Sequence, residues 1–144
     1  MIYIDTSCLL KIFREEPHSV AVKAAVMAES EVIVSSLTEI EALVQLKGIW
    51  AGGGFTRPQW RKLEAELMLL RNQEPFRFQP VPASVFHTAL RQHRNAGDIH
   101  CRTLDRLHLA AMEEFKISRL MTFDEGQARA AVEAGFEVLR PGLD

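Results

Sequence analysis

Four acidic residues stand where a predicted strand ends or a predicted helix begins. Asp5 and Asp124 follow short apolar runs, and Glu41 and Asp105 lie in the first or second turn of predicted helices. Carboxylates that are gathered at one site repel each other, and this repulsion strongly raises the pKa of at least one of them. A divalent cation removes that repulsion, and an oxygen-only ligand set suits Mg²⁺ or Mn²⁺. Because such an ion polarises a phosphoryl oxygen and activates a bound water, the four acids predict metal-dependent phosphodiester hydrolysis.

The elements that must position these acids alternate between strand and helix. Short β-favouring runs predict strands at 2–5, 32–35, 120–124 and 136–139, with a weaker strand, at a sheet edge, at 76–81. Apolar residues with a helical recurrence and capping signals predict helices at 7–14, 19–30, 36–51, 56–72, 83–95, 103–116 and 125–134. This order predicts one α/β domain over residues 1–144, with a parallel sheet covered by helices on both faces.

Parallel strands that are joined by right-handed crossovers end at the same edge of a sheet. If the strands before Asp5 and Asp124 are neighbours, we expect these two carboxylates to converge. Glu41 shares a helical face with Thr38 and lies at the same edge, and Asp105 suits the positive end of its helix. Three of the acids also have a purely structural interpretation: Asp5 as a helix cap, Asp105 as a helix-start acid and Glu41 as a solvated side chain.

Other polar residues nearby compete for these roles. Ser36 and Glu39 fit an S-x-x-E capping box, so we assign Glu39 to the helix cap and not to the site. Asp98 lies in a glycine-containing loop and is interpreted as a turn residue. His108 shares a helical face with Asp105. A lone histidine on an apolar helix is more often packed in the core, and hard cations favour oxygen, so we predict packing for His108.

Composition, charge and cysteine content limit the classes of protein to which this chain can belong. The 144-residue chain has a formal net charge of −2, so no global basic field marks nucleic-acid binding, although its 17 Lys and Arg residues can still form local patches. Cys8 and Cys101 are far apart and predict reduced core thiols. The chain has neither a signal-peptide pattern nor an apolar run long enough to cross a membrane, so we expect a cytoplasmic protein without a membrane partner.

Four segments, taken in order, resemble one known family. They are Ile4-Asp5-Thr6-Ser7, Ser35-x-x-Thr38-x-x-Glu41, Arg102-Thr103-Leu104-Asp105-x-x-His108-Leu109-Ala110 and Thr122-x-Asp124. Over essentially the whole chain the sequence is similar to PIN domains, and among them to the VapC-type toxins of type II toxin–antitoxin modules. The resemblance implies a Rossmann-like fold and a Mg²⁺- or Mn²⁺-dependent ribonuclease that forms a homodimer and pairs with an antitoxin. The metal-binding catalytic acids of the family correspond here to Asp5, Glu41, Asp105 and Asp124.

Some residues lie outside this pattern. Arg106 stands where the family usually has a small residue, and it can either contact RNA phosphate or pair with an acid. Trp50, Phe55 and Trp60 flank a run of three glycines, and we expect them to contact a partner protein and not to stack on bases. The two predicted helices that border this run are expected to build the homodimer interface, with an antitoxin groove beside it.

Two other functions remain open. A haloacid-dehalogenase-like phosphohydrolase would use Asp5 as its nucleophile, but that class needs a second aspartate two residues later, where this chain has Ser7. A non-catalytic binding module of the same fold would have no need for an intact set of four acids. RNA cleavage that depends on Mn²⁺ and stops in EDTA separates a ribonuclease from both.

Overall fold

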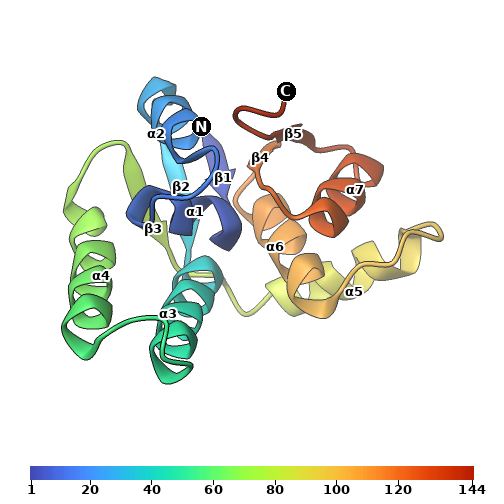
Figure 1. The fold of residues 1–144 in the computed structure, drawn as a ribbon. Helices are drawn as coiled ribbons and strands as arrows, with labels where there is room; N and C mark the ends of the chain where they lie inside the picture. Colours follow the sequence, from blue (N-terminus) through green and yellow to red (C-terminus); the bar gives the residue numbers. More distant parts are fainter.

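A five-stranded parallel sheet forms the centre of the molecule in the computed structural model, which describes residues 1–144 (Figure 1). Its strands are β1 (Ile2–Ile4), β2 (Val32–Ser35), β3 (Phe76–Gln79), β4 (Arg119–Met121) and β5 (Glu137–Leu139). They lie in the order β3-β2-β1-β4-β5, and every neighbouring pair is parallel. The predicted parallel sheet is therefore confirmed. β3 is an edge strand, as expected, and β1 and β4 are neighbours.

Seven α-helices connect the strands. They are α1 (Thr6–Phe13), α2 (Ser19–Ala28), α3 (Ser36–Ala51), α4 (Arg57–Leu69), α5 (Val85–Asn95), α6 (Thr103–Glu114) and α7 (Glu125–Glu133), and a short 3₁₀-helix, η1 (Leu70–Asn72), continues α4. Each predicted helix is present, with ends that move by a turn at most, which is the usual uncertainty of helix ends. None of these helices has the length and apolar character that a membrane crossing requires.

The helices cover the two faces of the sheet in separate groups (Figure 1). Ile2 and Ile4 point to the face that α1–α4 cover, whereas Tyr3 between them points to the face that α5–α7 cover. This alternation follows from the pleat of a strand, in which successive side chains leave opposite faces. All three residues of β1 are fully buried. Burial on both faces explains why this strand has no exposed polar position.

The start of α3 differs from the predicted capping box. The N-cap is Ser35, whose hydroxyl accepts a hydrogen bond from the backbone N–H of Thr38 at 3.1 Å. The hydroxyl of Ser36 instead accepts from the backbone N–H of Val81 at 2.9 Å, and Glu39 pairs with Arg71. The prediction was wrong by one residue because β2 runs directly into α3, so the last strand residue is also the cap.

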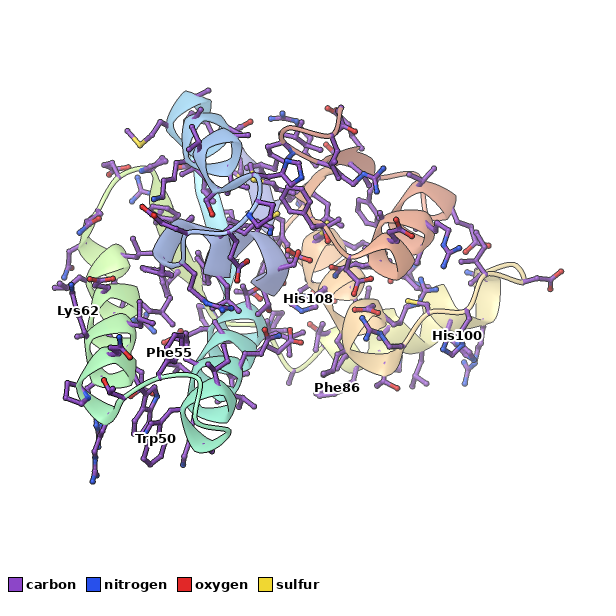
Figure 2. The ribbon with its side chains drawn as sticks, in the orientation of Figure 1. Trp50, Phe55, Lys62, Phe86, His100 and His108 are labelled. Atoms are coloured by element: carbon purple, nitrogen blue, oxygen red, sulfur yellow. The ribbon has the colours of Figure 1, made fainter.

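The aromatic residues beside the glycine run lie within the hairpin of α3 and α4. Trp50 and Trp60 stack with ring centroids 4.2 Å apart and an angle of 9° between the planes. Trp60 is buried and Phe55 is partly buried against the same core (Figure 2). Trp50 and Trp60 thus join the two helices to each other, and the expected contact of this region with a partner protein stays a prediction.

Candidate active site

All four predicted acids line one cavity at the carboxyl ends of β1 and β4. The order of the strands reverses between β1 and β4, and open α/β sheets bind ligands at such a switch point. The volume of the cavity, which we call the acid cavity, is about 380 Å³. It is lined by Asp5, Thr6, Ser7, Glu41, Gln45, Arg102, Thr103, Leu104, Asp105, His108, Asp124 and Gln127. The fold therefore brings Asp5, Glu41, Asp105 and Asp124 together from four different helix starts.

Asp5 forms the buried floor of the acid cavity. It is the N-cap of α1, where its Oδ1 accepts hydrogen bonds from the backbone N–H of Cys8 at 3.0 Å and from the Ser7 hydroxyl at 2.7 Å. Its Oδ2 accepts a hydrogen bond from the Thr122 hydroxyl. Burial raises the pKa of Asp5, and the hydrogen bonds from Thr122 and Ser7 oppose that rise. Asp5 therefore both caps α1, which is the structural interpretation given for it above, and faces the cavity.

A chain of buried hydrogen bonds connects Glu41 to the core. The Oε1 of Glu41 accepts a hydrogen bond from the Thr6 hydroxyl at 3.2 Å and contacts Nε2 of His108. Nδ1 of His108 lies 2.6 Å from the hydroxyl oxygen of Tyr3, which lies 2.6 Å from the hydroxyl oxygen of Ser35. The ring of His108, a residue of α6, thus points toward α3 and lies in the middle of the molecule (Figure 2).

One arrangement of protons satisfies this whole chain. Ser35 donates to Tyr3, Tyr3 donates to Nδ1 of His108, and the Nε2–H group of His108 donates to Glu41. Burial raises the pKa of Tyr3, so its hydroxyl keeps the proton that it donates. The predicted packing of His108 in the core is confirmed by its burial, and its ring also contacts Glu41, which the sequence did not predict. The sequence signal for this chain is Tyr3 itself, since a tyrosine in a buried strand needs a partner for its hydroxyl.

The guanidinium of Arg102 joins the other two acids. Its Nε donates to Oδ2 of Asp105 at 2.8 Å, and its Nη2 donates to Oδ2 of Asp124 at 2.6 Å. Asp124 is also the N-cap of α7, because its Oδ1 accepts from the backbone N–H of Gln127 at 2.8 Å. The hydrogen bond with Asp105 is the main reason why the pKa of Arg102 is raised. Sequence reasoning assigned no role to Arg102, whose only signal is its position three residues before Asp105.

The oxygen atoms of the acid cavity fit a hard divalent cation. Four carboxylates and three hydroxyls line it, and it contains no cysteine. However, no three Asp, Glu, His or Cys side chains are grouped closely enough to hold one ion. The reason is that protein donors already hold the carboxylates: Arg102, His108 and Thr122 each bind at least one of them. The acids therefore share a cavity without forming a ligand shell, and the predicted metal site stays a prediction.

Asp98 and Arg106, two further polar residues considered in the sequence, lie outside the acid cavity. Asp98 is exposed in the loop between α5 and α6, which agrees with its interpretation as a turn residue. Arg106 is buried, pairs with no acid, and lines a separate cavity beside Arg91 and Glu133. Of its two predicted roles, pairing with an acid is excluded by this geometry.

The fold and the acid cavity define the class of protein. A parallel α/β sheet with acids at its switch point is typical of proteins that bind ligands at the carboxyl ends of their strands. The family model of the PIN domain matches residues 2–133, and the chain belongs to this family.

Several solved structures share the fold of this chain. VapC20 of Mycobacterium tuberculosis, described as a sarcin–ricin loop cleaving toxin, has a TM-score of 0.74 and 18% identity, with 98% of this chain and 100% of that chain covered. FitAcB from Neisseria gonorrhoeae has a TM-score of 0.67 and 20% identity, with 98% of each chain covered. VapBC2 from Rickettsia felis, bound to a promoter DNA fragment, has a TM-score of 0.70 and 9% identity, with 96% and 98% covered. No curated protein matches the sequence.

Proposed function

We propose that this protein is a Mg²⁺- or Mn²⁺-dependent endoribonuclease and the toxin of a type II toxin–antitoxin pair. The observation that carries the proposal is the convergence of Asp5, Glu41, Asp105 and Asp124 on one cavity at the switch point of the sheet. Membership of the PIN family and the likeness of the fold to VapC20, a toxin described as cleaving a ribosomal RNA loop, support this choice.

The four acids would hold the metal, which polarises a phosphoryl oxygen and lowers the pKa of a bound water. Asp5 is fixed by three donors, so its carboxylate is already oriented toward the cavity. Glu41 is fixed in the same way by Thr6 and His108. Such prior orientation reduces the reorganisation that a charged transition state requires.

The geometry favours this reaction over the two alternatives. A haloacid-dehalogenase-like phosphohydrolase with Asp5 as its nucleophile needs a second aspartate two residues later, and this chain has Ser7 there, whose hydroxyl donates to Asp5. A non-catalytic binding module gives no reason for four acids to share one cavity. The cavity is exposed and gathers negative charge, and a phosphodiester is itself negative. A metal bound between the two would remove their repulsion.

The partners that we propose are an RNA substrate, a cognate antitoxin and a second copy of this chain. FitAcB and VapBC2 are complexes of this fold, which supports a protein partner. Exposed apolar side chains on α3 and α5, among them Ile40, Val44, Phe86 and Leu90, offer an interface (Figure 2 labels Phe86). Light scattering of the purified protein at high micromolar concentration tests the homodimer, and a monomer would contradict it.

The test of the enzyme proposal compares two matched substitutions. Asp124→Asn removes a carboxylate from the acid cavity, whereas Asp98→Asn removes an exposed carboxylate outside it. We expect Mn²⁺ to raise the melting temperature of the wild type, because a ligand of the native state stabilises it. RNA cleavage should require Mn²⁺, stop in EDTA, fall steeply in Asp124→Asn and stay unchanged in Asp98→Asn. Cleavage that persists in EDTA would contradict the proposal.

A further inference from the structure

Arg102 is the only lysine or arginine in the lining of the acid cavity. It precedes α6 directly, and its guanidinium reaches across to the first residue before α7. Three of its contacts go to the acids: Nε to Asp105 Oδ2 at 2.8 Å, Nη2 to Asp105 Oδ1 at 3.4 Å and Nη2 to Asp124 Oδ2 at 2.6 Å. The side chain is nevertheless 63% exposed, so it lines the cavity on the side that faces solvent.

This position makes Arg102 a competitor for any cation that enters the cavity. The carboxylate oxygens that the guanidinium uses belong to two of the four acids proposed as metal ligands. A metal bound to the same oxygens would lie within a few ångströms of the guanidinium, and the two positive charges would repel each other. Because the guanidinium is exposed, water can replace its side of these ion pairs when it is released.

We propose that Arg102 is a displaceable counter-cation: it neutralises Asp105 and Asp124 until a metal takes them, and it then binds a phosphate of the RNA at the cavity mouth. This inference rests on the proposed function. In the second state Arg102 is a substrate-binding residue, because its guanidinium touches the phosphodiester.

The chemistry of the side chain supports the second role. A guanidinium presents two parallel N–H donors, which match the oxygens of a phosphate as well as those of a carboxylate. Arg102 is the residue directly before α6. Its guanidinium therefore stays near the acids after it has released them. It then offers a positive charge at the place where an incoming phosphate meets the cavity, whose other charged groups are carboxylates.

Two substitutions of exposed arginines test the proposal. Arg102→Gln removes the charge and keeps a side chain that can hydrogen-bond. Arg129→Gln is the matched control, because Arg129 lines the groove beside the acid cavity but forms no ion pair with the acids. Calorimetric titration with Mn²⁺ alone measures the affinity of each variant for the metal without RNA, and steady-state cleavage of a single-stranded RNA gives kcat and KM.

Arg102→Gln should bind Mn²⁺ about three- to tenfold more tightly than the wild type, since it removes a competing charge that is held by partly exposed ion pairs. Its KM for RNA should rise by about tenfold, with Arg102→Lys in between because lysine keeps the charge without the fork. Arg129→Gln should match the wild type in Mn²⁺ affinity.

Three outcomes overturn the proposal, and they are distinguishable. Equal Mn²⁺ affinity in the wild type and Arg102→Gln would show that the guanidinium does not compete. Weaker Mn²⁺ affinity in Arg102→Gln would show that Arg102 is a permanent brace for the acids. If neither protein binds Mn²⁺, the proposed function falls together with this inference, whereas the first two outcomes leave the proposed function intact.

Discussion

The two halves of the acid cavity are held in different ways. On the inner half, Asp5 and Glu41 are held by Thr122 and His108, which are almost completely buried. On the outer half, Asp105 and Asp124 are held together by Arg102, which is mostly exposed. A buried network loses much when one member is removed, whereas an exposed ion pair contributes little. The inner half is therefore part of the folded core, and the outer half can exchange its partner.

The largest expected effect is on cleavage when Asp5 is replaced. Asp5→Asn keeps the shape of the side chain and its cap on α1 but removes the charge at the cavity floor. We expect the rate of RNA cleavage in Mn²⁺ to fall by about 10²-fold or more, since loss of one strong electrostatic element typically has this effect. Single-turnover cleavage with wild type and variant measures it. An unchanged rate would remove Asp5 from the site.

The same variant separates chemistry from folding through its pH dependence. The pKa of Asp5 is raised in the folded protein, so this carboxyl contributes stability below its unfolded pKa and loses that contribution as the pH rises through its folded pKa. In EDTA near about pH 7, Asp5→Asn should therefore be at least as stable as the wild type, and the difference should close toward about pH 4. A denaturant midpoint that collapses at neutral pH would show that the folded protein needs the charge of Asp5.

The next effect in size concerns the inner network. Tyr3→Phe removes one hydroxyl and leaves His108 Nδ1 without its donor, whereas Ser35 keeps its hydrogen bonds with Thr38. We expect the free energy of unfolding to fall by about 1–3 kcal/mol, which is the usual effect of leaving buried polar groups unpaired. Urea denaturation in EDTA measures this. A change in the free energy of unfolding near zero would show that the inner network stabilises the fold no more than the ion pairs of the outer half do.

A smaller effect is expected on the outer half. Asp105→Asn breaks the ion pair with Arg102, and the free energy of unfolding should change by less than about 1 kcal/mol because the guanidinium is exposed. Cleavage should nevertheless fall as steeply as in Asp5→Asn. If the denaturant midpoint collapses together with the rate, Asp105 has a structural role and the contrast between the halves fails.

The smallest effect is expected at Glu39, two residues before Glu41. Glu39 lies outside the acid cavity and pairs with the partly exposed Arg71. Glu39→Gln should leave cleavage unchanged and shift the free energy of unfolding by no more than about 0.5 kcal/mol. Parallel assays of Glu39→Gln and Glu41→Gln measure the difference. Equal loss of cleavage in the two variants would mean that charge near α3, and not the position of Glu41, governs activity.

The architecture and the four acids could be predicted from the sequence because both depend on local patterns. Apolar runs that end in Asp5 and Asp124 identify parallel strands that point to one edge, and the structure places those strands next to each other. Gly135, with φ of 88°, ends α7 in the left-handed conformation that glycine adopts readily after a helix. These features need only the chain within a few residues of each position.

The partners of the acids could not be predicted because they come from distant parts of the chain. Tyr3 and His108 are 105 positions apart, and His108 and Glu41 are 67 apart. Nothing in the neighbourhood of His108 distinguishes a packed ring from one that holds a carboxylate. The bridge from Arg102 to Asp124 likewise depends on how α6 and α7 meet, which no single-sequence pattern contains.

The stacked pair Trp50 and Trp60 gives the protein an optical reporter. They are the only two tryptophans of the chain, so intrinsic fluorescence and near-ultraviolet circular dichroism come largely from the α3–α4 hairpin. Neither ring lines the acid cavity, so metal titrations should leave this signal almost unchanged. A partner that opens the hairpin would separate the rings and remove their exciton coupling. One spectrum can thus distinguish events at the hairpin from events at the acids.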